Sequence, residues 1–216
     1  MTARVLACIS LLVLTTSLWA QNYDWPVYHG DHTASHYSPL DEIHAGNVND
    51  LQPAWIFRTE FKGTMQCNPL IIDGVVYLVD QRLRVFALDA ATGNQRWSYD
   101  PSPNGNSSGG CRGFAHWKSA DGSQQRLFYT VGNHVHALDP SKGIIATDFG
   151  NNGRIDLRQD LDNDIQKLFV ASSTPGVVFN DLLIMGSRVG EGPSVAAPGH
   201  IRAYDVRSGK RRWIFH

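Results

Sequence analysis

The chain has 216 residues, of which 42% are hydrophobic, with 20 Gly and 10 Pro. This composition favours a turn-rich globular β protein over a helical bundle or a disordered chain. Lys and Arg number 19 against 20 Asp and Glu, without a long run of one sign, so the sequence indicates neither a nucleic-acid surface nor a polybasic membrane patch. We therefore expect a small molecule as the partner.

The N-terminus has the pattern of a secretory signal. An apolar run from Val5 to about Leu18 follows a basic residue and ends near the small Ala20. We predict cleavage near this alanine, which gives a signal peptide over residues 1–20 and a mature domain over 21–216. A retained anchor is disfavoured because the run is shorter than the roughly 20 apolar residues that a bilayer requires. The expected location is the periplasm, and association of the mature protein with the membrane stays open.

The first part of the mature chain leads into a hairpin. Residues 24–43 carry few strand signals and several turn residues, and the chain becomes strand-like over 54–59. A hairpin is predicted over 69–79, because Asp73 and Gly74 stand between two apolar, β-branched runs.

Three units of short strands follow from this point. Residues 83–89 and 96–100 add two strands to the hairpin and complete a unit of four. A second unit is predicted over 114–149 and a third over 176–216. Between them, residues 154–169 are the one plausible helical insertion.

A short pattern recurs at one spacing in the three units. It reads ALDAATGNQRW from Ala87, ALDPSKGIIAT from Ala137 and AYDVRSGKRRW from Ala203. The Asp can accept hydrogen bonds from the turn backbone, the Gly can adopt a positive φ, and Trp97 gains most by burial against another sheet. Four-stranded repeats of roughly 40 to 50 residues indicate propeller blades rather than a β-sandwich. Because a propeller needs about four blades or more to close, we expect the chain to be part of a larger protein.

With these repeats, the chain resembles the quinoprotein dehydrogenases that use pyrroloquinoline quinone (PQQ). Their eight-bladed propellers are held by tryptophan-docking motifs of the form Ala-x-Asp-x-x-x-Gly-x-x-x-Trp, and the likeness covers essentially all of the chain after the signal. The resemblance implies an all-β fold with about three four-stranded blades of an expected eight. The second repeat has Thr147 where the Trp would stand, so we expect that blade junction to be packed differently.

The resemblance also implies a cofactor site built from several blades. "MQCNPLIIDGVVYL" resembles a first-blade segment whose Glu or Gln contacts the quinone, here Gln66. "GGCRGFAHW" resembles the segment that supplies a cofactor-binding arginine, here Arg112, whose guanidinium can hold a carboxylate or quinone oxygen with paired hydrogen bonds. "ASSTPGVVFNDLLIMGSRVGEG" resembles the third-blade segment, which assigns Ser173, or Thr174 in an alternative register, to the cofactor and Glu191 to Ca²⁺.

Two departures from the family pattern bear on the substrate. Alcohol-oxidising members often carry two adjacent cysteines just before the arginine, whereas Cys111 stands alone here. This departure, together with Gln66 in place of Glu, favours a sugar or polyol. Some glucose-oxidising relatives lack an acid at the position of Glu191. After removal of the signal, Cys67 and Cys111 are compatible with one disulfide or with two buried thiols.

The histidines carry a weaker signal. His29, His32 and His36 lie in the irregular lead-in, where solvated or loop-bonded histidines are more common than metal ligands. His134 and His136 point to the same side of one predicted strand, which is compatible with a solvated face.

The implied reaction is oxidation of an alcohol, or of the anomeric carbon of an aldose, with hydride transfer to the quinone. The expected electron acceptor is a membrane quinone or a cytochrome. In the family the catalytic aspartate and its neighbours come from later blades, so no catalytic residue is expected up to His216 and these 216 residues alone should be inactive.

A second hypothesis is a non-catalytic propeller, such as the periplasmic scaffold proteins that assist outer-membrane assembly and share these repeats. The set of Gln66, Arg112, Ser173 and Glu191 favours the dehydrogenase, because a scaffold has no use for these polar groups together.

Overall fold

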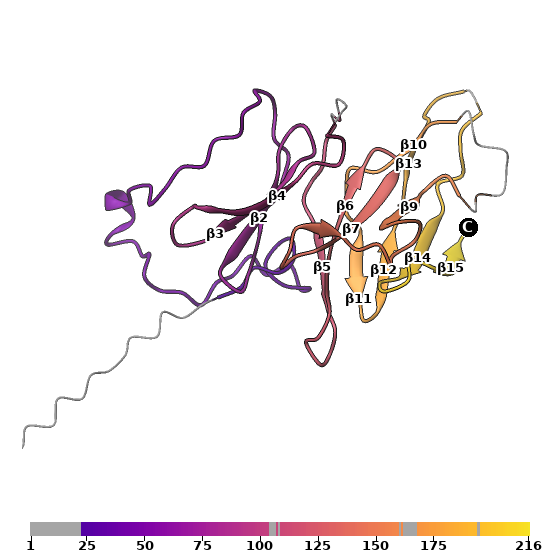
Figure 1. Ribbon diagram of the computed structural model, residues 1–216. Helices are drawn as coiled ribbons and strands as arrows, with labels where there is room; N and C mark the ends of the chain where they lie inside the picture. The colour runs from indigo at the N-terminus through magenta and orange to yellow at the C-terminus, as the bar shows by residue number, and fades with distance from the viewer. Residues whose placement is uncertain (1–22, 104–106, 108, 160, 162–167, 194) are drawn as a thin grey trace, which may run out of the picture.

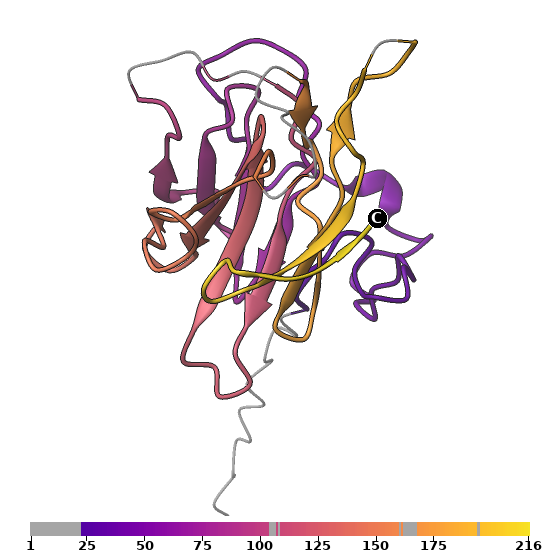
Figure 2. The same ribbon diagram turned by 90° about the vertical axis from the view of Figure 1, so that its right-hand side faces the viewer.

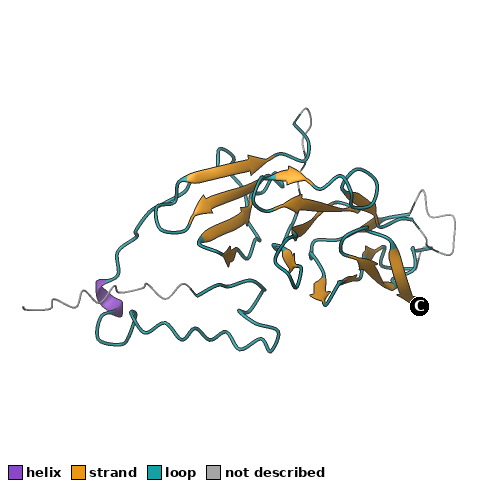
Figure 3. Ribbon diagram, turned by 60° about the horizontal axis from the view of Figure 1, so that its bottom comes forward, coloured by secondary structure: helices purple, strands orange, loops and turns teal. Residues whose placement is uncertain are grey.

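The computed structural model contains fifteen strands and one turn of 3-10 helix, Val48–Asp50, joined by loops, in the part of the chain that it describes (Figures 1 and 3). The described residues are 23–103, 107, 109–159, 161, 168–193 and 195–216. The predicted all-β fold is confirmed, and the signal peptide predicted over 1–20 lies outside these residues. No helix of the described part is long and apolar enough to cross a membrane.

The first sheet is a four-stranded antiparallel blade in the order β1-β2-β3-β4. Its strands are Leu70–Ile72, Val75–Val79, Val85–Asp89 and Gln95–Tyr99. The predicted hairpin is confirmed: Asp73 and Gly74 join β1 to β2 with φ values of 50° and 72°, as a two-residue hairpin loop requires. Residues 54–59, predicted to be strand-like, form no strand.

The second sheet follows the same order, β5-β6-β7-β8, with β9 pairing beside β8 on β7. Its strands are Ala115–Lys118, Gln125–Val131, His134–Asp139, Ile144–Ile145 and Arg154–Asp156. The helical insertion predicted over 154–169 is wrong at its start, because β9 pairs with β7 and aligns Ile155 with Val135 in the core. Residues 160 and 162–167 of that prediction lie outside the described residues.

The third sheet has the order β11-β12-β14-β15. Its strands are Val177–Phe179, Leu182–Met185, Ile201–Asp205 and Arg211–Phe215. A separate two-strand ladder joins β10, Val170–Ala171, to β13, Arg188–Val189. In Figure 1 the three sheets follow one another from left to right in chain order, and Figure 2 shows the third sheet in front of the second.

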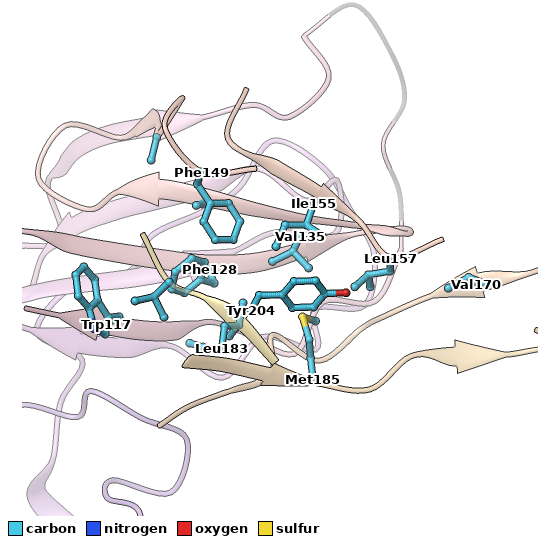
Figure 4. Close-up of a cluster of buried hydrophobic side chains, with 14 of the residues drawn as sticks. Trp117, Phe128, Val135, Phe149, Ile155, Leu157, Val170, Leu183, Met185 and Tyr204 are labelled. Carbon is cyan, nitrogen blue, oxygen red and sulfur yellow. The ribbon is translucent and has the colours of Figure 1, made fainter. Parts of the chain in front are cut away.

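Two clusters of buried side chains fill the seams between successive sheets. On the central strand β6, Leu127 and Tyr129 belong to the cluster shared with the first sheet, whereas Phe128 belongs to the cluster shared with the third. In the second cluster, Phe128 lies close to Leu183 and Tyr204 of the third sheet (Figure 4). Because alternate residues of one strand are buried on opposite faces, the second sheet is packed on both sides, as a propeller blade requires.

The predicted tryptophan docking is present between the first two blades. The Trp97 ring lies against Gly143, where an added Cβ would overlap the ring, and its Nε1 donates to the Pro140 carbonyl at 3.0 Å. Trp55 makes the same pair of contacts with the first blade, through Gly93 and the Ala90 carbonyl at 3.0 Å. The sequence before Trp55 lacks the Asp and Gly at the spacing of the repeat, so it predicts no docking role for this residue.

The junction between the second and third blades is packed differently, as the Thr147 departure predicted. The glycine of the third repeat, Gly209, faces a turn at Phe149 and Gly150 rather than an indole ring. The Gly150 amide donates to the Ser208 carbonyl at 3.0 Å, and a Cβ on Gly209 would lie 2.6 Å from that amide nitrogen. Backbone therefore replaces the ring as the partner of the repeat glycine.

We expect Gly209→Ala to lower the free energy of unfolding more than Gly74→Ala, by about 2 kcal/mol. Both glycines have nearly the same φ, 70° and 72°, so both variants carry the same backbone strain. Gly74 has no atom near an added Cβ, so the difference isolates the contact with Gly150. Urea denaturation of the two variants measures this difference in the free energy of unfolding. Equal values would show that the backbone at Gly150 moves to accept the added Cβ without loss of stability.

His136 corrects the expectation of a solvated histidine face. Its side chain is buried between Tyr99 of the first blade and Tyr129 of its own, with Nδ1 3.4 Å from the Tyr99 hydroxyl. His134 stays half-buried, and only this part of the expectation holds. Burial, with a smaller effect of Arg154, lowers the pKa of His136 to about 3.

The buried His136 should make the fold acid-sensitive below pH 6.5. Folding lowers its pKa from 6.5, so between the two pKa values the unfolded chain is protonated at this histidine and the folded protein is not. The free energy of unfolding therefore falls as the pH drops from 6.5 toward the folded pKa. Between pH 7 and pH 5 this contributes a loss of about 2 kcal/mol. Urea denaturation at both pH values should show a smaller loss for His136→Gln than for the unmodified protein, and equal losses would contradict the assignment.

Candidate functional site

The predicted cofactor segments meet where the first strands of three blades begin. Gln66 precedes β1, Arg112 precedes β5, and Ser173 precedes β11. Asn68 and Gly113 form an isolated parallel bridge between the first two of these segments, and β5 contacts β11. Residues far apart in the sequence therefore lie side by side at the N-terminal ends of β1, β5 and β11.

Hydrogen bonds hold the Arg112 backbone from both sides. Its carbonyl accepts from the Asn68 amide at 3.1 Å and from Asn68 Nδ2 at 3.2 Å, and its own amide donates to the Ser173 carbonyl at 2.8 Å. The Arg112 side chain is exposed and makes no ion pair with any described residue. Its charge is therefore available for an anionic ligand.

Arg112 lines a cavity of about 530 Å³, within the range typical of small-molecule sites. Asn68 and Thr174 line the same cavity, whereas Gln66 and Ser173 do not. Apolar side chains of β1, β5, β11 and β12 make up much of the remaining wall. The cation of Arg112 beside amide and hydroxyl groups suits a flat ligand with a carboxylate group, and the lining also includes one carboxylate, Asp31.

Residues of the segment 27–34, which precedes the first blade, line the cavity on one side, and the sequence pattern does not predict this placement. Trp25 exchanges two backbone hydrogen bonds with Ile71 of β1, of 2.7 and 3.1 Å. This pairing fixes the segment that brings His29, Asp31 and His32 to the cavity wall. A single bridge without an alternating apolar pattern leaves no strand signal in the sequence.

Gln66 lies against the loop that carries Arg112. A Cβ on Gly110 would be 2.5 Å from Gln66 Oε1, so only a glycine permits this approach without movement of the amide. The structure thus brings Gln66 next to the Arg112 loop while leaving its side chain exposed. Its contact with a cofactor stays a prediction.

The two alternatives in the third blade differ in placement. The Thr174 side chain is exposed at the cavity, whereas the Ser173 carbonyl is engaged by the Arg112 amide. The Ser172 hydroxyl is a local partner for this turn, donating to the Thr174 carbonyl at 2.9 Å. Thr174 therefore has better access to a ligand in this cavity.

Glu191 is not brought to Ser173. In the antiparallel ladder of β10 and β13, Ala171 is aligned with Arg188 and Val170 with Val189. Ser173 and Glu191 therefore leave the ladder at opposite ends, and Glu191 is exposed. The described residues contain no group of three or more His, Cys, Asp or Glu side chains arranged to hold a metal ion. Calcium binding by Glu191 stays a prediction.

Cys67 and Cys111, the two cysteines in the described part of the chain, are free thiols, which matches one of the two alternatives. Cys67 Sγ accepts from the Val79 amide at 3.3 Å, and Cys111 Sγ donates to the Gly113 carbonyl at 3.4 Å. Burial raises the pKa of Cys67 to about 12 and also raises that of Cys111. Both thiols are therefore inert neighbours of the site rather than nucleophiles.

The family description "Glucose/ethanol/alcohol dehydrogenase, beta-propeller domain", a PQQ family, matches residues 25–216. The quinoprotein glucose dehydrogenase of Escherichia coli K12 is 28% identical over 213 residues, covering 89% of this chain and 27% of that protein. The quinohemoprotein alcohol dehydrogenase of Comamonas testosteroni is 31% identical over 201 residues, covering 90% of this chain and 26% of its own.

Solved structures agree with the sequence matches. The crystal structure of the Comamonas testosteroni quinohemoprotein alcohol dehydrogenase superposes with a TM-score of 0.70 at 28% identity, covering 89% of this chain and 27% of its own. A europium-containing methanol dehydrogenase, 22% identical with a TM-score of 0.66 over 88% of this chain and 31% of its own, shares the fold. The chain thus spans about a quarter of the length of the curated relatives it matches.

Proposed function

We propose that this chain, which belongs to the PQQ-dependent glucose/ethanol/alcohol dehydrogenase β-propeller family, forms part of an enzyme that oxidises a sugar, a polyol or an alcohol. The observation that carries the proposal is Arg112, which is anchored to the segments of Asn68 and Ser173, lines the cavity and has no ion-pair partner among the described residues. The chain spans only part of its relatives, so the reaction is proposed for the complete protein.

The residues at the cavity suit PQQ, a flat tricarboxylate with a quinone. Arg112 would hold a carboxylate or quinone oxygen through its forked donors, and Thr174 would donate or accept one hydrogen bond. Gln66 and Ser173 are proposed as further contacts on the same loops. The bound quinone supplies the hydride acceptor, while the blades orient it and exclude water on one side.

A sugar or polyol is the favoured substrate class. Gln66 and the single Cys111 support this choice as departures from the alcohol-oxidising pattern. Relatives of both kinds are similar to the chain, a quinoprotein glucose dehydrogenase at 28% identity and a quinohemoprotein alcohol dehydrogenase at 31%, so the choice rests on these two departures. The catalytic base is expected outside the 216 residues, and the electron acceptor is proposed to be a membrane quinone or a cytochrome.

We further propose calcium as the metal and the periplasm as the location. Glu191 would be one oxygen ligand among the six to eight that Ca²⁺ takes. The remaining ligands would come from outside the described residues, because these residues alone form no such group.

A cofactor titration tests the proposed function. The complete protein without its predicted signal is titrated with PQQ and Ca²⁺ while cofactor absorbance and dye reduction are followed with glucose, polyols and simple alcohols. Saturable binding with sugar-dependent dye reduction is the expected outcome. A well-folded protein that binds no PQQ would overturn the proposal and favour a non-catalytic scaffold.

A further inference from the structure

Asn68 makes two hydrogen bonds to one acceptor across the seam between the first two blades. Its amide and its Nδ2 both donate to the Arg112 carbonyl, at 3.1 and 3.2 Å, although the two residues are 44 positions apart in the sequence. The Ser173 carbonyl holds the amide of the same arginine at 2.8 Å. Segments of the first and third blades thus both bind the backbone of one residue of the second blade.

The segment around Arg112 is rich in glycine, so hydrogen bonds from other segments are needed to order its backbone. Gly109 and Gly110 precede it and Gly113 follows it, and glycines have more backbone freedom to lose than any other residue. Gly113 has a φ of 123°, and a Cβ there would lie 2.6 Å from the Asn68 carbonyl oxygen. The close approach of Asn68 therefore depends on this glycine, and without the contact the arginine would sample many positions.

We propose that Asn68 is a positioning residue for Arg112, which it orders before the cofactor binds. This inference rests on the proposed function, because the ordering matters for an anionic ligand of Arg112. Asn68 also lines the cavity that Arg112 lines. Pre-ordering lowers the entropy lost on binding, and its removal should therefore weaken affinity.

The test measures PQQ affinity of the complete protein for four variants, by titration of cofactor absorbance. Asn68→Ala removes the Nδ2 donor and should weaken binding about tenfold, the effect of one hydrogen bond. Ser119→Ala is the matched control, since it removes hydrogen bonds of a buried side chain in the β5–β6 turn. This control should bind PQQ as the unmodified protein does.

A double-mutant cycle separates positioning from a general loss of stability. Arg112→Lys retains a charge but not the fork, so it should bind weakly, and adding Asn68→Ala should weaken binding less than twofold further. If Asn68→Ala binds as tightly as the unmodified protein, or if the two effects multiply in full, the positioning role is wrong.

Hydrogen exchange gives a readout that needs no cofactor. In the protein without PQQ, Asn68→Ala should speed exchange of the amides of residues 111–114 at least fivefold, while Ser119→Ala should not. Failure of the unmodified protein to bind PQQ would defeat the proposed function alone. Unchanged exchange in Asn68→Ala would defeat the positioning role alone.

Discussion

Trp97→Ala should lower the free energy of unfolding by about 3 kcal/mol, as expected for deletion of a large aromatic ring from a packed seam. The ring lies on Gly143 of the next blade and packs beside Tyr77, at a centroid distance of 5.9 Å. Its Nε1 also bonds the Pro140 carbonyl. Urea denaturation of the complete protein measures the change.

Trp97→Phe separates the ring from the hydrogen bond. Phenylalanine retains an aromatic face against Gly143 but leaves the Pro140 carbonyl without its indole donor. The expected cost is about 1 to 2 kcal/mol, smaller than that of the alanine variant. Equal losses for both variants would mean that the hydrogen bond, rather than the stacked ring, holds this blade junction.

Arg112→Ala should weaken PQQ binding by about 100-fold or more. A forked guanidinium makes two charge-assisted hydrogen bonds, each worth more than a neutral one, and both are lost together. The Arg112 backbone bonds to Asn68 and Ser173 do not involve the side chain, so the fold should persist. Absorbance titration of the cofactor gives the affinity, and circular dichroism checks the fold.

Arg96→Ala is the matched control for this prediction. Arg96 is an exposed arginine of β4 that forms an ion pair with Asp89 at 2.8 Å, and it does not line the Arg112 cavity. The Arg96→Ala variant should bind PQQ as tightly as the unmodified protein. Normal binding by Arg112→Ala would remove this residue from the cofactor site and with it the main support for the proposed function.

Local patterns sufficed for the turns of the repeats and for most strands of the three four-stranded sheets, although residues 54–59 form no strand and β9 was not predicted. Asp73 and Gly74 predict a hairpin because a two-residue turn restricts its own φ angles, whatever lies nearby. Trp97 and the repeat glycines predict ring docking at the first junction because they recur at the spacing of the docking motif. Thr147 even identifies the junction that differs, since a threonine has no ring to stack.

Other features depended on contacts between distant segments. His134 and His136 have the same place in the alternation of β7, but His136 is buried between Tyr99 of the neighbouring blade and Tyr129 of its own. The start of the predicted helix pairs as β9 because Ile155 is in the core beside Val135. Trp55 has no Asp or Gly motif before it, so its docking position is visible only in three dimensions.

The candidate site divides in the same way. The residue types of Gln66, Arg112 and Ser173, and the likeness of their segments to a family, predict a cofactor site from the sequence alone. That Asn68 holds the Arg112 carbonyl, and that the β10–β13 ladder directs Glu191 away from Ser173, follows from pairing across the chain. Strand and turn preferences act within a few residues, so they are written locally in the sequence, whereas burial and positioning arise from neighbours that only folding brings together.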